Sequence, residues 1–173
     1  MGLINQGVYP EPKEGEGVFS SPLSLTESFF SLFRSDSVFI LDKVENNRAR
    51  LDNSDRPVVG SILSLSDNSV RALDVRTNAF CATGSLLPNG SWAVFGGNQA
   101  VGFGGSSVTD GTGPYSSIDG RKAVRLMDPQ ANNADLFWLD DASIQMSNVR
   151  WYPSSETLKN GEVVILGGAT SGG

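Results

Sequence analysis

The sequence of 173 residues contains no histidine, one cysteine, and 13 basic residues against 19 acidic ones. The absence of histidine removes the commonest general base and the commonest metal ligand in proteins. The single cysteine, Cys81, cannot form an intramolecular disulfide, so cysteine usage indicates no redox compartment. The net charge of −6 argues against nucleic acid as a partner, because binding a polyanion requires clustered lysine and arginine.

Long apolar runs are also lacking. No run approaches the roughly 18 apolar residues that a membrane span needs, so we expect no membrane partner. The first residues, Met1–Gly7, lack a basic region followed by an apolar core, and no cleavable secretory signal is visible. The following stretch mixes proline, glycine and charge without an apolar period. We therefore expect residues 1–36 to form an irregular N-terminal leader and residues 37–173 to form the folded domain.

Glycine and proline are plentiful, with 20 and 8 residues scattered among short apolar runs. This distribution favours many turns and short strands, so we expect an all-β fold. The apolar run 37–42 predicts a buried strand, whereas residues 24–33 fit either a short helix or a strand. Residues 58–65 and 69–75 flank a short polar connection and predict a hairpin.

The clearest hairpin signal is Asn89-Gly90, which lies between two apolar runs. It predicts a type I′ turn, in which both central residues need positive φ, joining paired strands at 86–87 and 92–95. Asn89-Gly90-Ser91 also matches the N-glycosylation sequon and would sit at an exposed turn. Further strands are predicted at residues 122–127, 136–139 and 144–146.

This hairpin pattern occurs twice. Leu-Pro-Asn-Gly at 87–90 precedes Ala-Val-Phe-Gly-Gly at 93–97, and Leu-Lys-Asn-Gly at 158–161 precedes Val-Ile-Leu-Gly-Gly at 164–168, a displacement of 71 residues in both parts. The same displacement carries Cys81 onto Tyr152, so a thiol and a phenol occupy equivalent positions of two repeat units. Strands that end in a double glycine after a hairpin are typical of kelch-type propeller blades.

The displacement exceeds the usual kelch period of about 50 residues, and the glycine-rich insertion 98–120 explains the excess. We predict a partial kelch-type β-propeller of about two to three four-stranded blades. A closed propeller has at least four blades, so we expect the ring not to be closed and the chain to be a fragment. Gly102-Phe103-Gly104-Gly105 is not a dinucleotide fingerprint, because no helix pattern follows and the third glycine is missing.

Equivalent positions on neighbouring blades lie at similar heights around the propeller axis. We therefore expect Cys81 and Tyr152 to be able to meet near the central channel. Each residue also has a purely structural interpretation. Cys81 would be a small buried hydrophobe, and Tyr152 would be a core or rim aromatic.

Phe80-Cys81-x-x-Gly84, together with Arg150-Trp151-Tyr152-Pro153, resembles the glyoxal oxidase branch of the copper radical oxidases, over about residues 38–173. In that family a thioether joins the cysteine to the tyrosine. The resemblance implies that Cys81 and Tyr152 form this radical cofactor and that Tyr152 ligates copper. It also implies oxidation of an aldehyde or primary alcohol by O₂ to give hydrogen peroxide, in an extracellular, secreted enzyme.

The chain differs from the family in the ligands of the copper site. The family completes its copper site with two histidines and a second tyrosine from later blades, but this sequence has no histidine. Tyr9 and Tyr115 match no family motif. We therefore expect copper at Tyr152 only if the missing ligands are supplied, and no bound metal or turnover in this chain alone. The alternative is a non-catalytic kelch-type binding module, because a fold does not determine its function.

Overall fold

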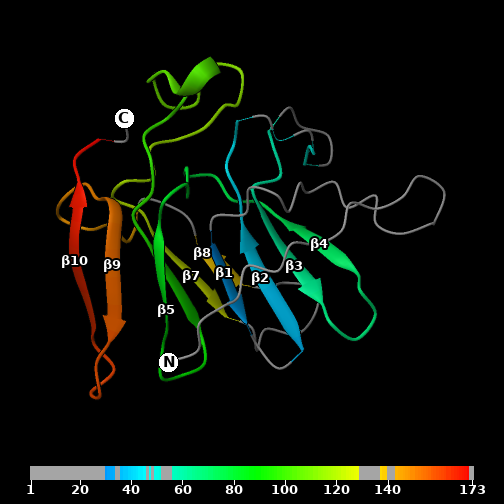
Figure 1. Ribbon diagram of the computed structural model, residues 1–173, viewed down its shortest axis with the longest axis vertical. Helices are drawn as coiled ribbons and strands as arrows, with labels where there is room; N and C mark the ends of the chain where they lie inside the picture. The colour runs from blue at the N-terminus through cyan, green and yellow to red at the C-terminus, as the bar shows by residue number, and fades with distance from the viewer. Residues whose placement is uncertain are drawn as a thin grey trace, which may run out of the picture.

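The computed structural model describes residues 30–33, 36–45, 47, 49–51, 56–128, 137–139 and 143–171. These residues form three antiparallel sheets and a single short 3₁₀ turn, η2 (Phe103–Gly105) (Figure 1). The predicted all-β class is confirmed. The described part of the chain contains no helix with the length and apolar character that a membrane span requires.

The first sheet contains β1 (Phe30–Phe33), β2 (Ser37–Leu41), β3 (Gly60–Ser64) and β4 (Val70–Leu73), in that order. The predicted strand at 37–42 and the hairpin over 58–75 are confirmed. β1 falls inside the stretch predicted as an irregular leader, where the pattern over 24–33 also allowed a strand. Residues 1–29 and 34–35 of that leader lie outside the described residues.

The second sheet repeats this order with β5 (Thr83–Leu86), β6 (Trp92–Phe95), β7 (Val124–Asp128) and β8 (Phe137–Leu139). The third sheet is the hairpin of β9 (Trp151–Thr157) and β10 (Val163–Ala169). The predicted strand at 144–146 is wrong. Only an isolated bridge between Ala123 and Gln145 forms there, so this segment adds no further strand to β7.

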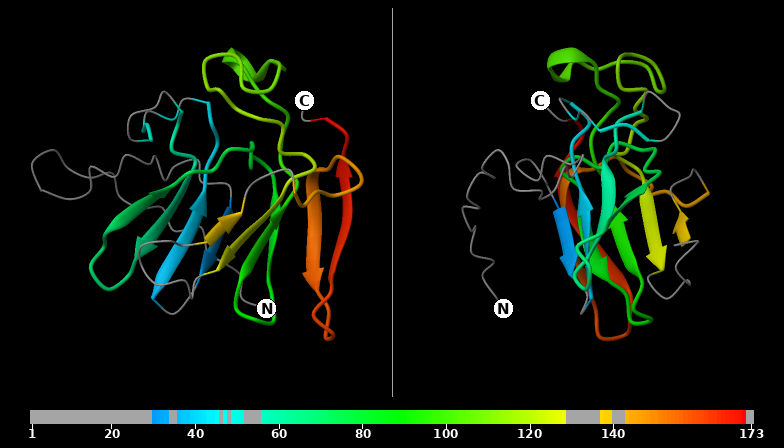
Figure 2. Two further views of the ribbon diagram at one scale, coloured as in Figure 1. Left: turned by 180° about the vertical axis from the view of Figure 1, so that it is seen from behind. Right: turned by 90° about the vertical axis from the view of Figure 1, so that its right-hand side faces the viewer.

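The three sheets follow one another across the molecule (Figure 2). The first strand of each sheet lies next to the first strand of the following one, since β1 contacts β5 and β5 contacts β9. Consecutive antiparallel strands in each sheet, and first strands that neighbour one another, are the arrangement of propeller blades. The described sheets form a partial β-propeller that does not close into a ring.

The core lies between the first and second sheets. Phe39 of β2 stacks on Trp92 of β6, with ring centroids 5.5 Å apart and an interplanar angle of 30°. Leu41, Val94 and Met127 are buried in the same cluster. Each large apolar side chain removed from water contributes about 1.5–3 kcal/mol, so this contact is a principal source of the attachment between the two sheets.

The turn between β5 and β6 is a hairpin, as predicted, but the predicted type I′ turn is wrong. Only Gly90 has positive φ, at 84°, and its N–H donates to the Leu87 carbonyl over 2.9 Å. The Leu87 N–H donates to the Ser91 carbonyl over 2.8 Å. This is a three-residue loop with a type I turn followed by a left-handed glycine. Pro88 favours it, because its ring holds φ near the value that a type I turn needs.

The third sheet uses the same turn. Gly161 has φ of 88°, and its N–H donates to the Leu158 carbonyl over 2.9 Å. The Leu158 N–H donates to the Glu162 carbonyl over 2.8 Å. The 71-residue displacement in sequence is therefore a repeat in backbone conformation as well.

Candidate functional site

Cys81 and Tyr152 lie where the first strands of the second and third sheets begin. Cys81 precedes β5 by two residues, and Tyr152 is the second residue of β9. The Tyr152 N–H donates to the Cys81 carbonyl over 3.1 Å. Further along the two strands, the Ser155 hydroxyl lies 2.9 Å from the Ser85 hydroxyl and 3.1 Å from that of Thr83. The structure therefore brings the two predicted residues together at the junction of β5 and β9.

Both residues have an uncommon backbone conformation. Cys81 has φ of 62° and Tyr152 has φ of 57°, and these are two of only four non-glycine residues with positive φ in the described part of the chain. The left-handed region costs an L-residue about 1–2 kcal/mol relative to glycine. A thiol and a phenol thus occupy equivalent positions at which glycine would be less strained. Backbone strain of this kind is common at functional sites.

The Cys81 thiol is buried, with 1% of the residue exposed. Burial raises the pKa of Cys81, and hydrogen bonding from Tyr152 and then from Trp151 lowers that pKa without cancelling the effect of burial. The same interaction with Cys81 raises the pKa of Tyr152. At neutral pH the site therefore holds a neutral thiol beside a neutral phenol.

Tyr152 is half-exposed, at 52%, so its phenol remains accessible to solvent. The Trp151 ring meets it edge to face, with centroids 4.7 Å apart and an interplanar angle of 73°. The Trp151 Nε1 atom is buried and has no hydrogen-bond partner of normal geometry among the described residues. The site thus combines a buried sulfur, an accessible phenol and an indole packed against that phenol.

Asn78 anchors the loop that carries Cys81. Asn78 is 1% exposed, and its Oδ1 atom accepts the Phe80 N–H over 3.1 Å. Its Nδ2 atom donates to the Gln99 carbonyl over 2.8 Å, and its own carbonyl accepts the Asn98 N–H over 3.1 Å. Sequence reasoning missed this residue, because a lone asparagine before an apolar residue resembles any turn residue.

The double glycine after β6 allows close approach of backbone segments. Gly97 has φ of 144°, and a Cβ atom added there would lie 2.0 Å from the Asn78 carbonyl oxygen. A Cβ atom added to Gly96 would lie 2.5 Å from the Arg150 carbonyl oxygen, and the Gly97 N–H donates to that same oxygen over 3.2 Å. The glycine pair therefore holds the segments before Cys81 and Tyr152 against the end of β6.

Arg125 is a buried residue that hydrogen-bonds to the glycine pair Gly96-Gly97. It is 0% exposed, and its Nη1 atom donates to the Gly96 carbonyl over 2.7 Å. Its Nε atom donates to the Thr77 hydroxyl over 2.7 Å. The sequence placed Arg125 in a predicted strand without assigning it a role. The only available signal was a charged residue in the middle of an apolar run.

The donor atoms at this site do not complete a copper site. Among the residues that the structure describes, no group of three or more histidine, cysteine, aspartate or glutamate side chains is placed to hold a metal ion. Tyr152 and Cys81 contribute one phenol oxygen and one sulfur, and the sequence has no histidine. The structure brings together the two residues that the resemblance assigns to the organic cofactor, but the described residues supply no further set of ligands for its copper.

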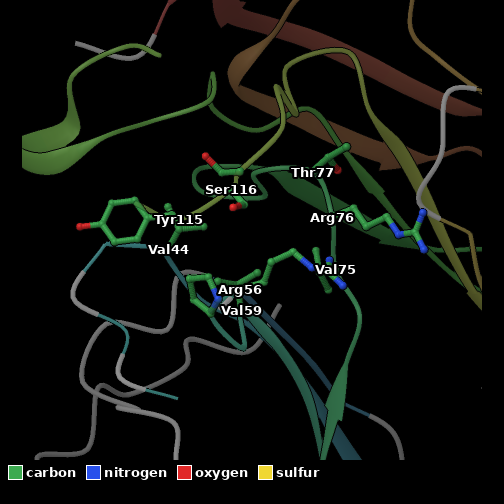
Figure 3. Close-up of a pocket in the computed structure, with 10 residues that line it drawn as sticks. Val44, Arg56, Val59, Val75, Arg76, Thr77, Tyr115 and Ser116 are labelled. Carbon is green, nitrogen blue, oxygen red and sulfur yellow. The ribbon is translucent and has the colours of Figure 1, made fainter. Parts of the chain in front are cut away.

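A separate small cavity lies between the first sheet and the glycine-rich insertion (Figure 3). Its lining includes Val44, Arg56, Thr77 and Tyr115, and it has room for about one water molecule. Neither Cys81 nor Tyr152 lines it. Tyr115, which matches no family motif, packs edge to face against Phe103 with centroids 5.9 Å apart.

Comparison with known proteins finds one relevant similarity. No protein-family model matches the chain. Over 107 residues the chain is 28% identical to an aldehyde oxidase, GLOX, from Vitis pseudoreticulata. This region covers 62% of the chain but only 17% of that relative's length. The chain is thus similar to a small part of an aldehyde oxidase.

Proposed function

We propose that this chain carries the cysteine–tyrosine part of an oxidase site, which oxidises aldehydes or primary alcohols with O₂ and releases hydrogen peroxide. The meeting of Cys81 and Tyr152, equivalent residues of two repeat units, carries the proposal. The similarity to an aldehyde oxidase supports the substrate class. Kelch-type blades and an extracellular location are part of the same proposal.

The proposed cofactor forms when the Cys81 sulfur bonds to the Tyr152 ring carbon next to the phenol oxygen. The S–H and C–H bonds break, and O₂ accepts the two electrons and two protons as hydrogen peroxide. The protein loses two hydrogen atoms. The contact between the Cys81 thiol and the half-exposed Tyr152 favours this coupling, because the reacting groups are already adjacent and O₂ can reach the ring.

A thioether next to a phenol oxygen lowers the oxidation potential of the ring, so Tyr152 could store one oxidising equivalent. Trp151 packed against the ring would limit access of reductants to it. In radical oxidases the protein positions and tunes such a cofactor. Since the residues present do not make a copper site, we expect no turnover from this chain by itself.

Peptide mass measurement tests the cofactor. The longest natural product of this gene, loaded with copper(II) under air, should yield a cross-linked peptide pair containing Cys81 and Tyr152, two hydrogens lighter than the separate peptides. Tyr152→Phe is the matched control and should retain a free thiol. A free Cys81 thiol in the loaded wild-type protein would contradict the proposal and leave the non-catalytic binding module as the interpretation.

Peroxide production tests the role of this chain alone. We expect the 173-residue chain, incubated with copper(II) and glyoxal, to produce no hydrogen peroxide above a protein-free control. Sustained turnover by this chain would refute the expectation that further ligands are required.

A further inference from the structure

The turn between β5 and β6 has a feature that the oxidase proposal does not use. Asn89-Gly90-Ser91 is the only Asn-x-Ser/Thr sequence among the 173 residues. The turn follows β5, whereas Cys81 precedes it, so the two lie at opposite ends of that strand (Figure 1). A group attached at this turn would leave the Cys81–Tyr152 site open.

The Asn89 side chain is held in a defined orientation. Asn89 is exposed, and its Oδ1 atom accepts the Ser91 N–H over 3.0 Å. This contact is an Asx turn, in which the asparagine side chain bonds the backbone two residues further on. The Asn89 Nδ2 atom has no hydrogen-bond partner among the described residues, so substitution of that nitrogen breaks no hydrogen bond within this part of the chain.

The third sheet contains a natural comparison with the same backbone. Asn160 occupies the equivalent turn position, and its Oδ1 atom accepts the Glu162 N–H over 3.2 Å. Its Nδ2 atom instead donates to the Glu162 carboxylate over 2.8 Å. Glu162 stands where the first turn has Ser91, so this turn lacks the hydroxyl that the sequon requires.

We propose that Asn89 is an acceptor site for N-linked glycosylation. The donor is an oligosaccharide linked to a lipid pyrophosphate. A bond forms between the Asn89 Nδ2 atom and the anomeric carbon of the sugar, and the bond from that carbon to the pyrophosphate oxygen breaks. The lipid pyrophosphate leaves, and a proton from the amide passes to the transferase. An exposed hairpin tip accommodates the bulky, soluble product.

The test uses the full chain, directed into the secretory pathway of a eukaryotic cell by an N-terminal signal sequence. The secreted wild-type protein should carry one glycan, removed by peptide N-glycosidase with conversion of Asn89 to aspartate. Asn89→Gln and Ser91→Ala should each be secreted without a glycan. Wild-type protein secreted without a glycan would overturn the proposal.

Glu162→Ser provides the matched control. It places a hydroxyl at the equivalent position of the second turn and removes the carboxylate that binds the Asn160 amide. We expect two glycans on this variant, at Asn89 and Asn160. Modification of Asn160 alone would show that the host glycosylates this turn but rejects Asn89, and would also overturn the proposal. Because no copper is involved, neither outcome depends on the proposed oxidase function.

Discussion

Substitution of Gly97 should be the most damaging single-methyl change near the candidate site. In Gly97→Ala the new Cβ atom would lie 2.0 Å from the Asn78 carbonyl oxygen and 3.3 Å from the Ala79 Cα atom. The first separation is too short for any real contact, so backbone must move. A φ of 144° is also a conformation that L side chains rarely adopt, which costs about 1–3 kcal/mol.

Movement of Asn78 would also weaken its hydrogen bond from the Asn98 N–H, now 3.1 Å long. Loss of such a hydrogen bond lowers the free energy of unfolding by about 1 kcal/mol. Together these effects predict a decrease of about 3 kcal/mol in the free energy of unfolding. Urea denaturation should show this decrease as a lower midpoint concentration, with an unchanged dependence of the free energy of unfolding on urea.

Gly104→Ala is the control for backbone conformation alone. Gly104 has φ of 67°, and a Cβ atom added there would have nothing within 4 Å. Its cost should be about 1 kcal/mol, from the left-handed conformation only. If Gly97→Ala costs no more than Gly104→Ala, close backbone approach is not the reason for glycine at position 97. Faster alkylation of Cys81 in Gly97→Ala would indicate that displacement of the loop at Asn78 exposes the Cys81 thiol to the reagent.

Three further substitutions test the site and its support. Tyr152→Phe removes the phenol that lowers the pKa of Cys81, so the midpoint of the alkylation rate against pH should move upward; a downward or absent shift would contradict the hydrogen bond. Because burial raises the pKa of Cys81 above its unfolded value of about 8.5, the thiol's contribution to stability is fully present below that pH and should decline above it, a decline that Cys81→Ala should lack. Arg125→Met leaves the buried Gly96 carbonyl and the Thr77 hydroxyl without the donor that each now has. Because each lost hydrogen bond to a charged group costs about 1.5–3 kcal/mol, we expect the free energy of unfolding from urea denaturation to fall by about 3 kcal/mol. An unchanged midpoint would refute the role of Arg125.

Local patterns predicted the strands and hairpins because their signals lie within a few residues. The run at 37–42 and the apolar residues after both Asn-Gly turns formed strands where expected. The strand predicted at 86–87 lies earlier, at Thr83–Leu86. The turn type was missed because Asn-Gly also fits a three-residue loop, in which the asparagine ends a type I turn and the glycine takes the left-handed conformation after it. The turn at Leu158–Gly161 has the same form without a proline. The strand predicted at 144–146 was wrong, because a short apolar run does not specify how much of it pairs; only the bridge between Ala123 and Gln145 forms.

Asn78 and Arg125 show why the support of the site could not be predicted. Each is a buried polar residue whose partners are distant in sequence, such as Gln99 for Asn78 and Thr77 for Arg125. A buried polar group is tolerated when those partners satisfy it. Nothing in the neighbouring sequence reports where the partners will lie.

The sequence by itself determined the all-β class and the equivalence of Cys81 and Tyr152, because both follow from spacing and a displacement of 71 residues. Only the tertiary structure decided that the thiol is buried, the phenol half-exposed and the two hydrogen-bonded through backbone and side chain. Burial and contact depend on how whole sheets pack, and β5 and β9 lie side by side through interactions that no local pattern contains.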